Sequence, residues 1–148
     1  MSIDVTAEAA IARPHEEVAG YALDYRNDPV WIGGIREAEL VDDGPFGAGS
    51  RVRRVAKFLG RRIEYVLQVA ELEPGRRIVM RSVKSPFPML VTYEFVDAPG
   101  GTLARIRVQG DPSGSYRLSD RLMAPMVRRS IGKDVRRLKE LLEARRDG

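Results

Sequence analysis

The chain contains no cysteine and only one histidine. Disulfides, thiolate catalysis and thiolate metal sites all need a thiol, so all three are excluded. A single histidine also excludes a histidine-rich metal site and leaves His15 as the one candidate for a histidine-based triad. The lack of cysteine fits the cytoplasm, which is where we expect this protein to be.

Long apolar runs are missing as well. The longest spans a handful of residues, whereas a helix needs about 20 to cross a bilayer. The first ten residues, MSIDVTAEAA, carry acids where a signal peptide would have a basic region and an apolar core. We therefore expect a soluble protein with no integral membrane segment.

A length of 148 residues fits one domain, which we place at 1–148. The net charge of +4 is unevenly distributed. The segment 116–148 holds ten basic residues against five acidic ones, whereas the rest of the chain holds 15 basic against 16 acidic. The basic excess therefore belongs to the C-terminal segment.

Period-two alternation predicts a half-buried strand over the first residues, with Ile3, Val5 and Ile11 on one face. Pro14 then suits the first turn of a helix, which we expect from 14 to about 25. Asn27, Asp28 and Pro29 should break this helix, and a short helical piece should carry Trp31.

Turn residues divide the middle of the chain into six strand candidates, near 36–42, 50–58, 61–72, 76–84, 88–96 and 102–110. With the first strand they make seven. The strands alternate between apolar and polar residues, which predicts an antiparallel sheet covered on one face. The apolar face includes Ile63, Tyr65, Leu67, Val69, Val91, Tyr93, Phe95, Ala104, Ile106 and Val108.

The C-terminal segment has the period of a long amphipathic helix. Its apolar residues are Met123, Val127, Ile131, Val135, Leu138 and Leu142. Pro125 should kink this helix or start it, because proline removes a backbone donor. The order of strand, helix, six strands and long helix predicts an α+β fold with the helices on one face of the sheet.

Several segments, taken in order, resemble one known family. They are Ala12-Arg13-Pro14-His15-Glu16-Glu17-Val18, Asp24, Pro29-Val30-Trp31, the Gly47-x-Gly49 pair before a strand, the Gly101-Thr102 hairpin and the closing amphipathic helix. This pattern is similar to the START-related SRPBCC superfamily, and its polyketide cyclase/dehydrase and lipid-transport branch fits best. The resemblance covers essentially the whole chain.

The resemblance implies a helix-grip fold. In that fold a curved seven-stranded antiparallel sheet wraps round the long C-terminal helix, with two short N-terminal helices, and encloses a deep apolar cavity. Members bind lipids, sterols, polyketides or plant hormones, some cyclise or dehydrate polyketides, and others act as cochaperones. Because one fold hosts many activities, it does not name a function by itself.

Bulky inward residues are the candidates for the wall of such a cavity. We expect ligand contacts from Trp31, Arg54, Tyr65, Met80, Tyr93, Phe95, Met123 and Met126. The alternative for each apolar member is simple core packing. The segments 85–88 and 111–115 could form a gate over the cavity or be ordinary loops.

Arg54 has two interpretations. If Val52 and Ala56 face inward, Arg54 does too and needs an acidic partner or an anionic ligand. In the opposite phase Val55 and Leu59 face inward and Arg54 is solvated. Periodicity does not decide between the two.

The remaining candidates are weaker. His15 is more typical of a helix-terminal surface residue than of a catalyst, and Asp24 of a turn-stabilising hydrogen bond. Tyr65 or Tyr93 could serve as a general acid, but no partner that would tune either is evident. We assign no catalytic residue and expect neither a metal nor a cofactor.

The basic helix residues are Arg128, Arg129, Lys133, Arg136, Arg137 and Lys139, interleaved with Asp134, Glu140 and Glu143. A solvated exterior is the simplest interpretation, and we expect no nucleic acid partner because no aromatic residues accompany these charges. A partner or membrane could nevertheless dock there.

Three functions stay open on the sequence. The first is binding of a small hydrophobic molecule, the second is a cyclase or dehydratase that uses the same cavity, and the third is docking through the basic helix. Two or more convergent titratable groups in the cavity would favour chemistry, and an all-apolar pocket would favour carriage. A homodimer is left open.

Overall fold

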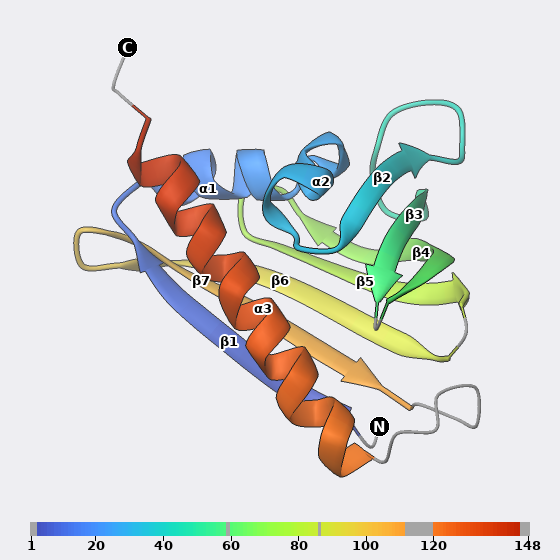
Figure 1. The fold of residues 1–148 in the computed structure, drawn as a ribbon. Helices are drawn as coiled ribbons and strands as arrows, with labels where there is room; N and C mark the ends of the chain where they lie inside the picture. Colours follow the sequence, from blue (N-terminus) through green and yellow to red (C-terminus); the bar gives the residue numbers. More distant parts are fainter. Residues whose placement is uncertain (1–2, 59, 86, 112–119, 146–148) are drawn as a thin grey trace.

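The computed structural model describes residues 3–58, 60–85, 87–111 and 120–145 (Figure 1). Seven antiparallel strands form one sheet in the order β1-β7-β6-β5-β4-β3-β2. The strands are β1 (Ile3–Ile11), β2 (Ile35–Leu40), β3 (Arg51–Phe58), β4 (Arg61–Glu73), β5 (Arg77–Lys84), β6 (Met89–Ala98) and β7 (Gly101–Gly110). The helices are α1 (His15–Ala22), α2 (Asp28–Trp31) and α3 (Asp120–Glu143), with a 3-10 turn, η1 (Tyr25–Asn27).

Each strand from β2 to β6 pairs with the next one in sequence, as hairpins require, whereas β1 pairs with β7. The start of β7 approaches the end of β1 so closely that only glycine fits at position 101. A Cβ atom there would lie 2.1 Å from the carbonyl oxygen of Ile11. Beside it, the Thr102 hydroxyl donates to the carbonyl of Arg13 at 2.7 Å and joins the start of β7 to the segment that follows β1.

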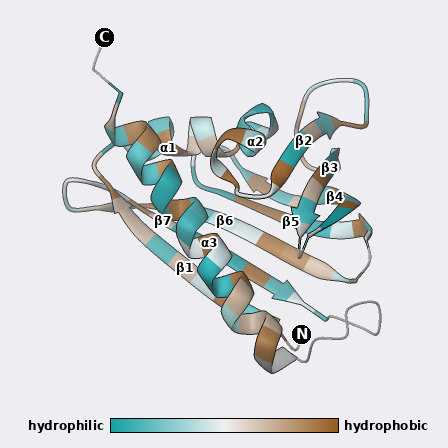
Figure 2. Ribbon diagram, in the orientation of Figure 1, coloured by the Kyte–Doolittle hydropathy of each residue, from teal (hydrophilic) through white to brown (hydrophobic). Residues whose placement is uncertain are grey.

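The helix α3 lies across one face of the sheet and packs along β1 (Figure 1). Brown apolar and teal polar segments alternate along its ribbon, as an amphipathic helix requires (Figure 2). Its buried apolar residues are Met123, Ile131, Val135, Leu138 and Leu142. Near its C-terminal end, Glu143 accepts from the amide of Ala12 at 2.9 Å, and Lys139 donates to the carbonyl of Ala10 at 2.7 Å.

Pro125 lies inside α3, in the second turn, so the prediction that it starts the helix is wrong. The helix begins five residues earlier, at Asp120. As the sixth residue of α3, Pro125 lies beyond the first four positions, whose amides have no partner within the helix, so it removes one backbone hydrogen bond of the helix.

The N-terminal helix is shorter than predicted and ends at Ala22. Asp24 adopts an extended conformation and accepts from the amide of Arg26 at 3.0 Å, which starts a 3-10 turn instead. The predicted hydrogen bond of Asp24 is thus confirmed. Pro29 does not break a helix but sits in the first turn of α2, where proline fits.

Ion pairs cover the outer face of the sheet. Arg105 bridges Glu8 and Glu94, at 2.7 Å and 3.0 Å. Arg107 pairs with Asp4 at 2.7 Å. This face is therefore polar and solvated, and the apolar residues of the sheet turn towards α3. In the described part of the chain, no helix combines the length and the apolar character that crossing a membrane needs.

Candidate functional site

A partly enclosed cavity of about 170 Å³ lies between the concave face of the sheet and the N-terminal half of α3. Strands β1, β2, β3, β4, β6 and β7 supply one wall, α3 supplies the opposite wall, and the segment from Trp31 to Gly33 closes one side. The apolar lining includes Ile35, Ile63, Val91, Ile106, Val108 and Val127. Apolar walls with a few polar groups are the usual composition of a small-molecule site.

One of the polar groups is a buried ion pair. The Nε and Nη2 atoms of Arg54 donate to Oδ2 of Asp28, at 3.1 Å and 2.8 Å. Nη2 also donates to the hydroxyl of Tyr93 at 3.2 Å. All three side chains are buried, with Arg54 only 4% exposed. The buried arginine therefore has an acidic partner within the chain.

Burial opposes the charge on Arg54, but Asp28, Tyr93 and Tyr65 together outweigh it and raise the pKa of Arg54 well above its ordinary value. Burial also raises the pKa of Asp28, an effect that the guanidinium counteracts. Because the two groups are in direct contact, we take the pair to be ionised at neutral pH. Burial raises the pKa of Tyr93 to about 12, with Arg54 opposing the shift, so the phenol stays protonated.

Trp31 is fully buried and packs edge-on against Tyr93, with ring centroids 5.5 Å apart. The carbonyl of Trp31 accepts from Nη1 of Arg137 at 3.2 Å, which ties α2 to α3. The indole Nε1–H is buried and has no acceptor among the described residues. Such an unmet donor costs about 1–3 kcal/mol, so it needs an explanation.

Asp134 is a second buried carboxylate in the cavity wall. Its Oδ1 accepts from the amide of Gly33 at 2.8 Å, and Arg137 lies 4.0 Å away. Burial raises the pKa of Asp134 to about 6, although the Gly33 amide, Arg137 and Arg54 all oppose the shift. This carboxyl therefore changes protonation state near neutral pH.

The structure brings five of the eight predicted ligand contacts together in the cavity wall: Trp31, Arg54, Tyr65, Tyr93 and Met123. The other three, Met80, Phe95 and Met126, lie outside the wall that the described residues form.

The geometry explains why each of these three residues lies outside the cavity wall. Met80 lies on the far side of Tyr93, against a separate void of about 10 Å³. Phe95 is one inward position beyond Tyr93 on β6 and is buried in the core. Met126 follows Met123 by three residues on α3 and is rotated away from the arc that includes Val127 and Ile131.

Arg54 of β3 faces inward and is buried, so the first of the two phases proposed for this strand is correct and the solvated alternative is wrong. Val52, Arg54 and Ala56 are buried on the inner side, yet Val55 is also only 2% exposed. Charged neighbours such as Arg36 and Arg62 line the same outer hollow as Val55, and their long stems can cover apolar surface. Leu59, the other half of the second phase, lies outside the described residues.

Sequence reasoning missed the burial of two carboxylates at this site. Asp28 was interpreted only as a helix breaker, and Asp134 only as part of a solvated helix face. The spacing contained the signal for Asp134, because it follows the buried Ile131 by three residues and precedes the buried Leu138 by four. Those intervals put it on the apolar side of α3. For Asp28, no comparable local pattern exists.

The other candidates lie outside the cavity. His15 is held by the carbonyl of Gly75, 3.0 Å from its Nδ1 atom. Of the predicted gate, Phe87 lines the cavity, whereas Pro86 and residues 112–115 lie outside the described residues. Within the ranges that the structure describes, no cluster of three or more side chains could hold a metal ion.

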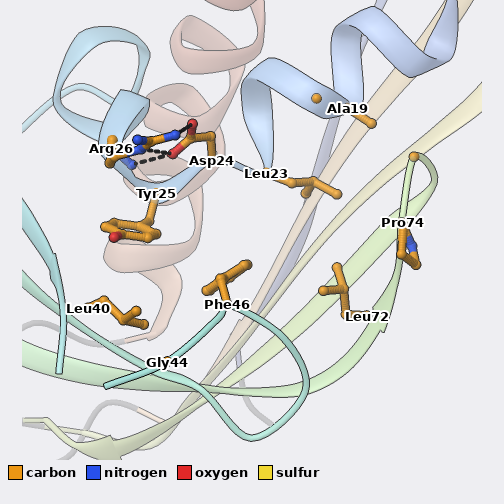
Figure 3. A pocket seen from close by; sticks show the side chains of 12 residues that line it. Ala19, Leu23, Asp24, Tyr25, Arg26, Leu40, Gly44, Phe46, Leu72 and Pro74 are labelled. Carbon is orange, nitrogen blue, oxygen red and sulfur yellow. Dashed lines mark hydrogen bonds and ion pairs between the residues drawn. The ribbon is translucent and has the colours of Figure 1, made fainter. Parts of the chain in front are cut away.

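A second, more open pocket of about 440 Å³ lies between α1, η1 and the loops after β2 and β4. Figure 3 shows Leu23, Tyr25, Phe46 and Leu72 around it, with Asp24 and Arg26 paired at the rim. The Asp24 carboxylate accepts from Arg26 at 2.7 Å, so these two polar groups already satisfy each other. No buried ionisable side chain lines this pocket in the described part of the chain. The central cavity is therefore the better candidate.

The basic face of α3 divides into two groups. Arg137 and Lys139 hold α2 and β1 in place through the hydrogen bonds described above. Arg128, Arg129, Lys133 and Arg136 extend along the rest of the helix, where Arg128, Arg129 and Arg136 are exposed.

Comparison with known proteins agrees with this architecture. The family model described as polyketide cyclase / dehydrase and lipid transport matches residues 2–143. No curated protein matches the chain.

Solved structures share the fold at low sequence identity. The protein TTHA0849 from Thermus thermophilus is 21% identical, with a TM-score of 0.82 over 96% of this chain and 99% of that one. The Zhui aromatase/cyclase from Streptomyces sp. R1128 is 15% identical, with a TM-score of 0.74 over 95% and 93%. A START superfamily protein from Mycobacterium smegmatis is 17% identical, with a TM-score of 0.71 over 95% and 94%.

These likenesses confirm the predicted helix-grip fold, and at such identities they show the fold alone. The match to the family model extends over nearly the whole chain, from the first strand to the end of α3. This chain belongs to the polyketide cyclase / dehydrase and lipid transport family, within the START-related SRPBCC superfamily.

Proposed function

We propose that the chain binds a small hydrophobic molecule in the cavity between the sheet and α3. The observation that carries this proposal is the cavity itself. Protein cores are packed so densely that voids larger than a water molecule are few, so a space of about 170 Å³ in the centre of the fold is unusual. Its apolar walls and its polar groups are what a bound molecule needs for burial and orientation.

Native mass spectrometry of the freshly purified protein tests this proposal, followed by extraction and identification of any bound molecule. We expect a defined small apolar molecule, or a rise in melting temperature when small apolar compounds are added. A Val91→Phe variant should lose the effect, because Val91 lines the cavity. Val96→Phe is the matched control on the outer side of the same strand, where Val96 is 36% exposed.

Two results would contradict binding in this cavity. One is a bound molecule that survives Val91→Phe at full occupancy, which would place the ligand elsewhere. The other is the absence of both a bound molecule and any thermal stabilisation.

A second candidate is an enzyme that uses the same cavity. It is favoured by four ionisable side chains in the wall, Arg54, Tyr65, Tyr93 and Asp134, where an all-apolar wall would favour carriage. Asp134 has the best placed pKa, about 6, because a general acid or base works best near the ambient pH.

Incubation of the extracted ligand with Asp134→Asn separates the two functions. An enzyme that moves protons through Asp134 would lose turnover in this variant but keep ligand binding. If the wild type produces no new product, or if the variant turns over as fast as the wild type, Asp134 has no such role.

A further inference from the structure

We propose that the cavity selects neutral molecules of about one substituted ring that carry an acceptor oxygen, and that it discriminates against carboxylates of the same size. This inference rests on the proposed function, because it names the class of molecule that the cavity would take. Three independent features of the wall lead to it.

The first feature is size. A cavity of about 150 Å³ lined by apolar side chains accommodates a molecule such as benzene, whereas sites for drug-sized ligands run from about 300 to 1,000 Å³. The cavity of about 170 Å³ therefore matches a single ring with a small substituent. The ion pair of Arg54 and Asp28 lies at its boundary, and the next void, beyond Tyr93, holds only about 10 Å³.

The second feature is charge. A buried arginine in an apolar cavity would ordinarily attract an anion, but Arg54 already has Asp28 at 2.8 Å. Asp134 adds another carboxylate to the wall, so these three groups together are neutral when Asp134 is protonated and negative when it is ionised. An entering carboxylate would lose its hydration and gain no uncompensated cation from these groups.

The third feature is the unmet donor. Trp31 lines the cavity, and its indole can only donate a hydrogen bond. The buried Nε1–H has no acceptor among the described residues. The Nε1 atom has almost no accessible surface, so a ligand must displace the side chains around it to reach this donor. A ketone or hydroxyl oxygen that does so would supply the acceptor, which a hydrocarbon cannot do.

The test uses four probes: acetophenone, ethylbenzene, benzoate and the three-ring ketone 2-acetylanthracene. Isothermal titration gives the affinities. Trp31 is the only tryptophan, so its indole gives one signal in a nitrogen-15 correlation spectrum, which reports directly on the donor. We expect acetophenone to bind about tenfold or more tighter than each of the other three. The indole signal should move downfield with acetophenone but not with ethylbenzene.

Two variants separate the contribution of the Trp31 donor from that of the Asp134 charge. Trp31→Phe should remove the preference for acetophenone over ethylbenzene. Asp134→Asn, which keeps an oxygen to accept from Gly33, should narrow the gap between acetophenone and benzoate, and it keeps the test valid if Trp31→Phe does not fold.

The outcomes are distinguishable. Benzoate binding as tightly as acetophenone would overturn the charge argument, and tighter binding of 2-acetylanthracene would overturn the size argument. Equal binding of ethylbenzene and acetophenone, with an unmoved indole signal, would overturn the role of the donor. In each of these cases the proposed function stands. If no probe binds and the native protein carries no molecule, the proposed function itself fails.

Discussion

At the scale of single residues, three charged groups on three different elements meet at the cavity. Arg54 comes from β3, Asp28 from the start of α2 and Asp134 from α3. Each is at most 4% exposed, so each depends on its partners inside the fold. A buried charge without a partner is far more costly than a surface charge, and this difference makes the cluster testable.

Replacement of Arg54 by methionine should destabilise the protein by about 3–5 kcal/mol, because it leaves Asp28 buried without a partner. Arg53→Met, at the next position of β3, should cost about 1 kcal/mol or less, since Arg53 pairs with Glu39 and Glu64 on the solvated face. Urea denaturation measures both values.

A double replacement tests the buried pair as a double-mutant cycle. Asp28→Asn combined with Arg54→Met should cost less than the sum of the single changes, because no charge is then left unpaired. Equal costs for Arg53→Met and Arg54→Met would show that the buried pair contributes nothing beyond a surface pair.

Asp134 makes stability depend on pH. Its pKa rises from the ordinary 3.8 to about 6 on folding, so the folded chain binds more protons than the unfolded chain between these values. Its contribution to stability is therefore full below about pH 3.8 and falls as the pH rises to about 6. Asp134→Asn abolishes this loss, so the variant should gain about 2–3 kcal/mol relative to the wild type between about pH 4 and pH 7.5.

Urea denaturation at several pH values measures that gain. The quantity to follow is the difference in the free energy of unfolding between variant and wild type, because the other carboxyl groups also titrate over this range. A difference that stays constant with pH would mean that the folded environment does not raise the pKa of Asp134.

At the scale of elements, two glycines show how differently closely packed and open positions respond to an added side chain. Gly132 lies in the interior of α3, where an added Cβ would meet nothing within 4 Å. Gly101 lies at the start of β7, where an added Cβ would collide with the backbone of Ile11. The same substitution should therefore have opposite effects at the two sites.

We expect Gly132→Ala to stabilise the protein by about 0.5–1 kcal/mol, because alanine loses less conformational entropy in a helix than glycine. Gly101→Ala should cost more than about 3 kcal/mol or prevent folding, since the colliding atom belongs to the backbone. Thermal and urea unfolding of both variants measure the changes. A loss of stability in Gly132→Ala would contradict the open environment that we describe.

At the scale of the whole molecule, the sheet joins its first and last strands through the pairing of β1 with β7, and α3 packs along β1. The first and last elements of the chain are therefore neighbours, and the cavity wall draws on residues from Ile3 to Asp134. Loss of either terminal element would open the core, so we expect the described parts of the chain to unfold together.

This expectation corresponds to the prediction of a single domain. Trp31 fluorescence reports on packing in the cavity, and far-ultraviolet circular dichroism reports on the sheet and helices. The two signals should give the same midpoint in urea and in heat, as one cooperative transition requires. Separate midpoints would divide the chain into units that unfold independently.

The order of the elements and the face that most of them bury follow from the sequence alone. Period-two alternation in strands such as β6 and the three- and four-residue spacing of α3 are local properties, since side-chain direction follows from backbone geometry. Residues that are apolar and inward in these patterns, such as Tyr65, Tyr93 and Met123, were therefore predicted to be buried, and they are.

The packing of distant segments in the folded chain determines which of these residues line the cavity and which charges meet there. Arg54 and Asp28 are 26 positions apart, and Gly33 and Asp134 are 101 apart, so no local pattern records either contact. The separation of Met80 and Phe95 from the cavity also depends on where α3 crosses the sheet. Periodicity sets the direction of a side chain, but the place where two elements meet depends on how the whole chain packs.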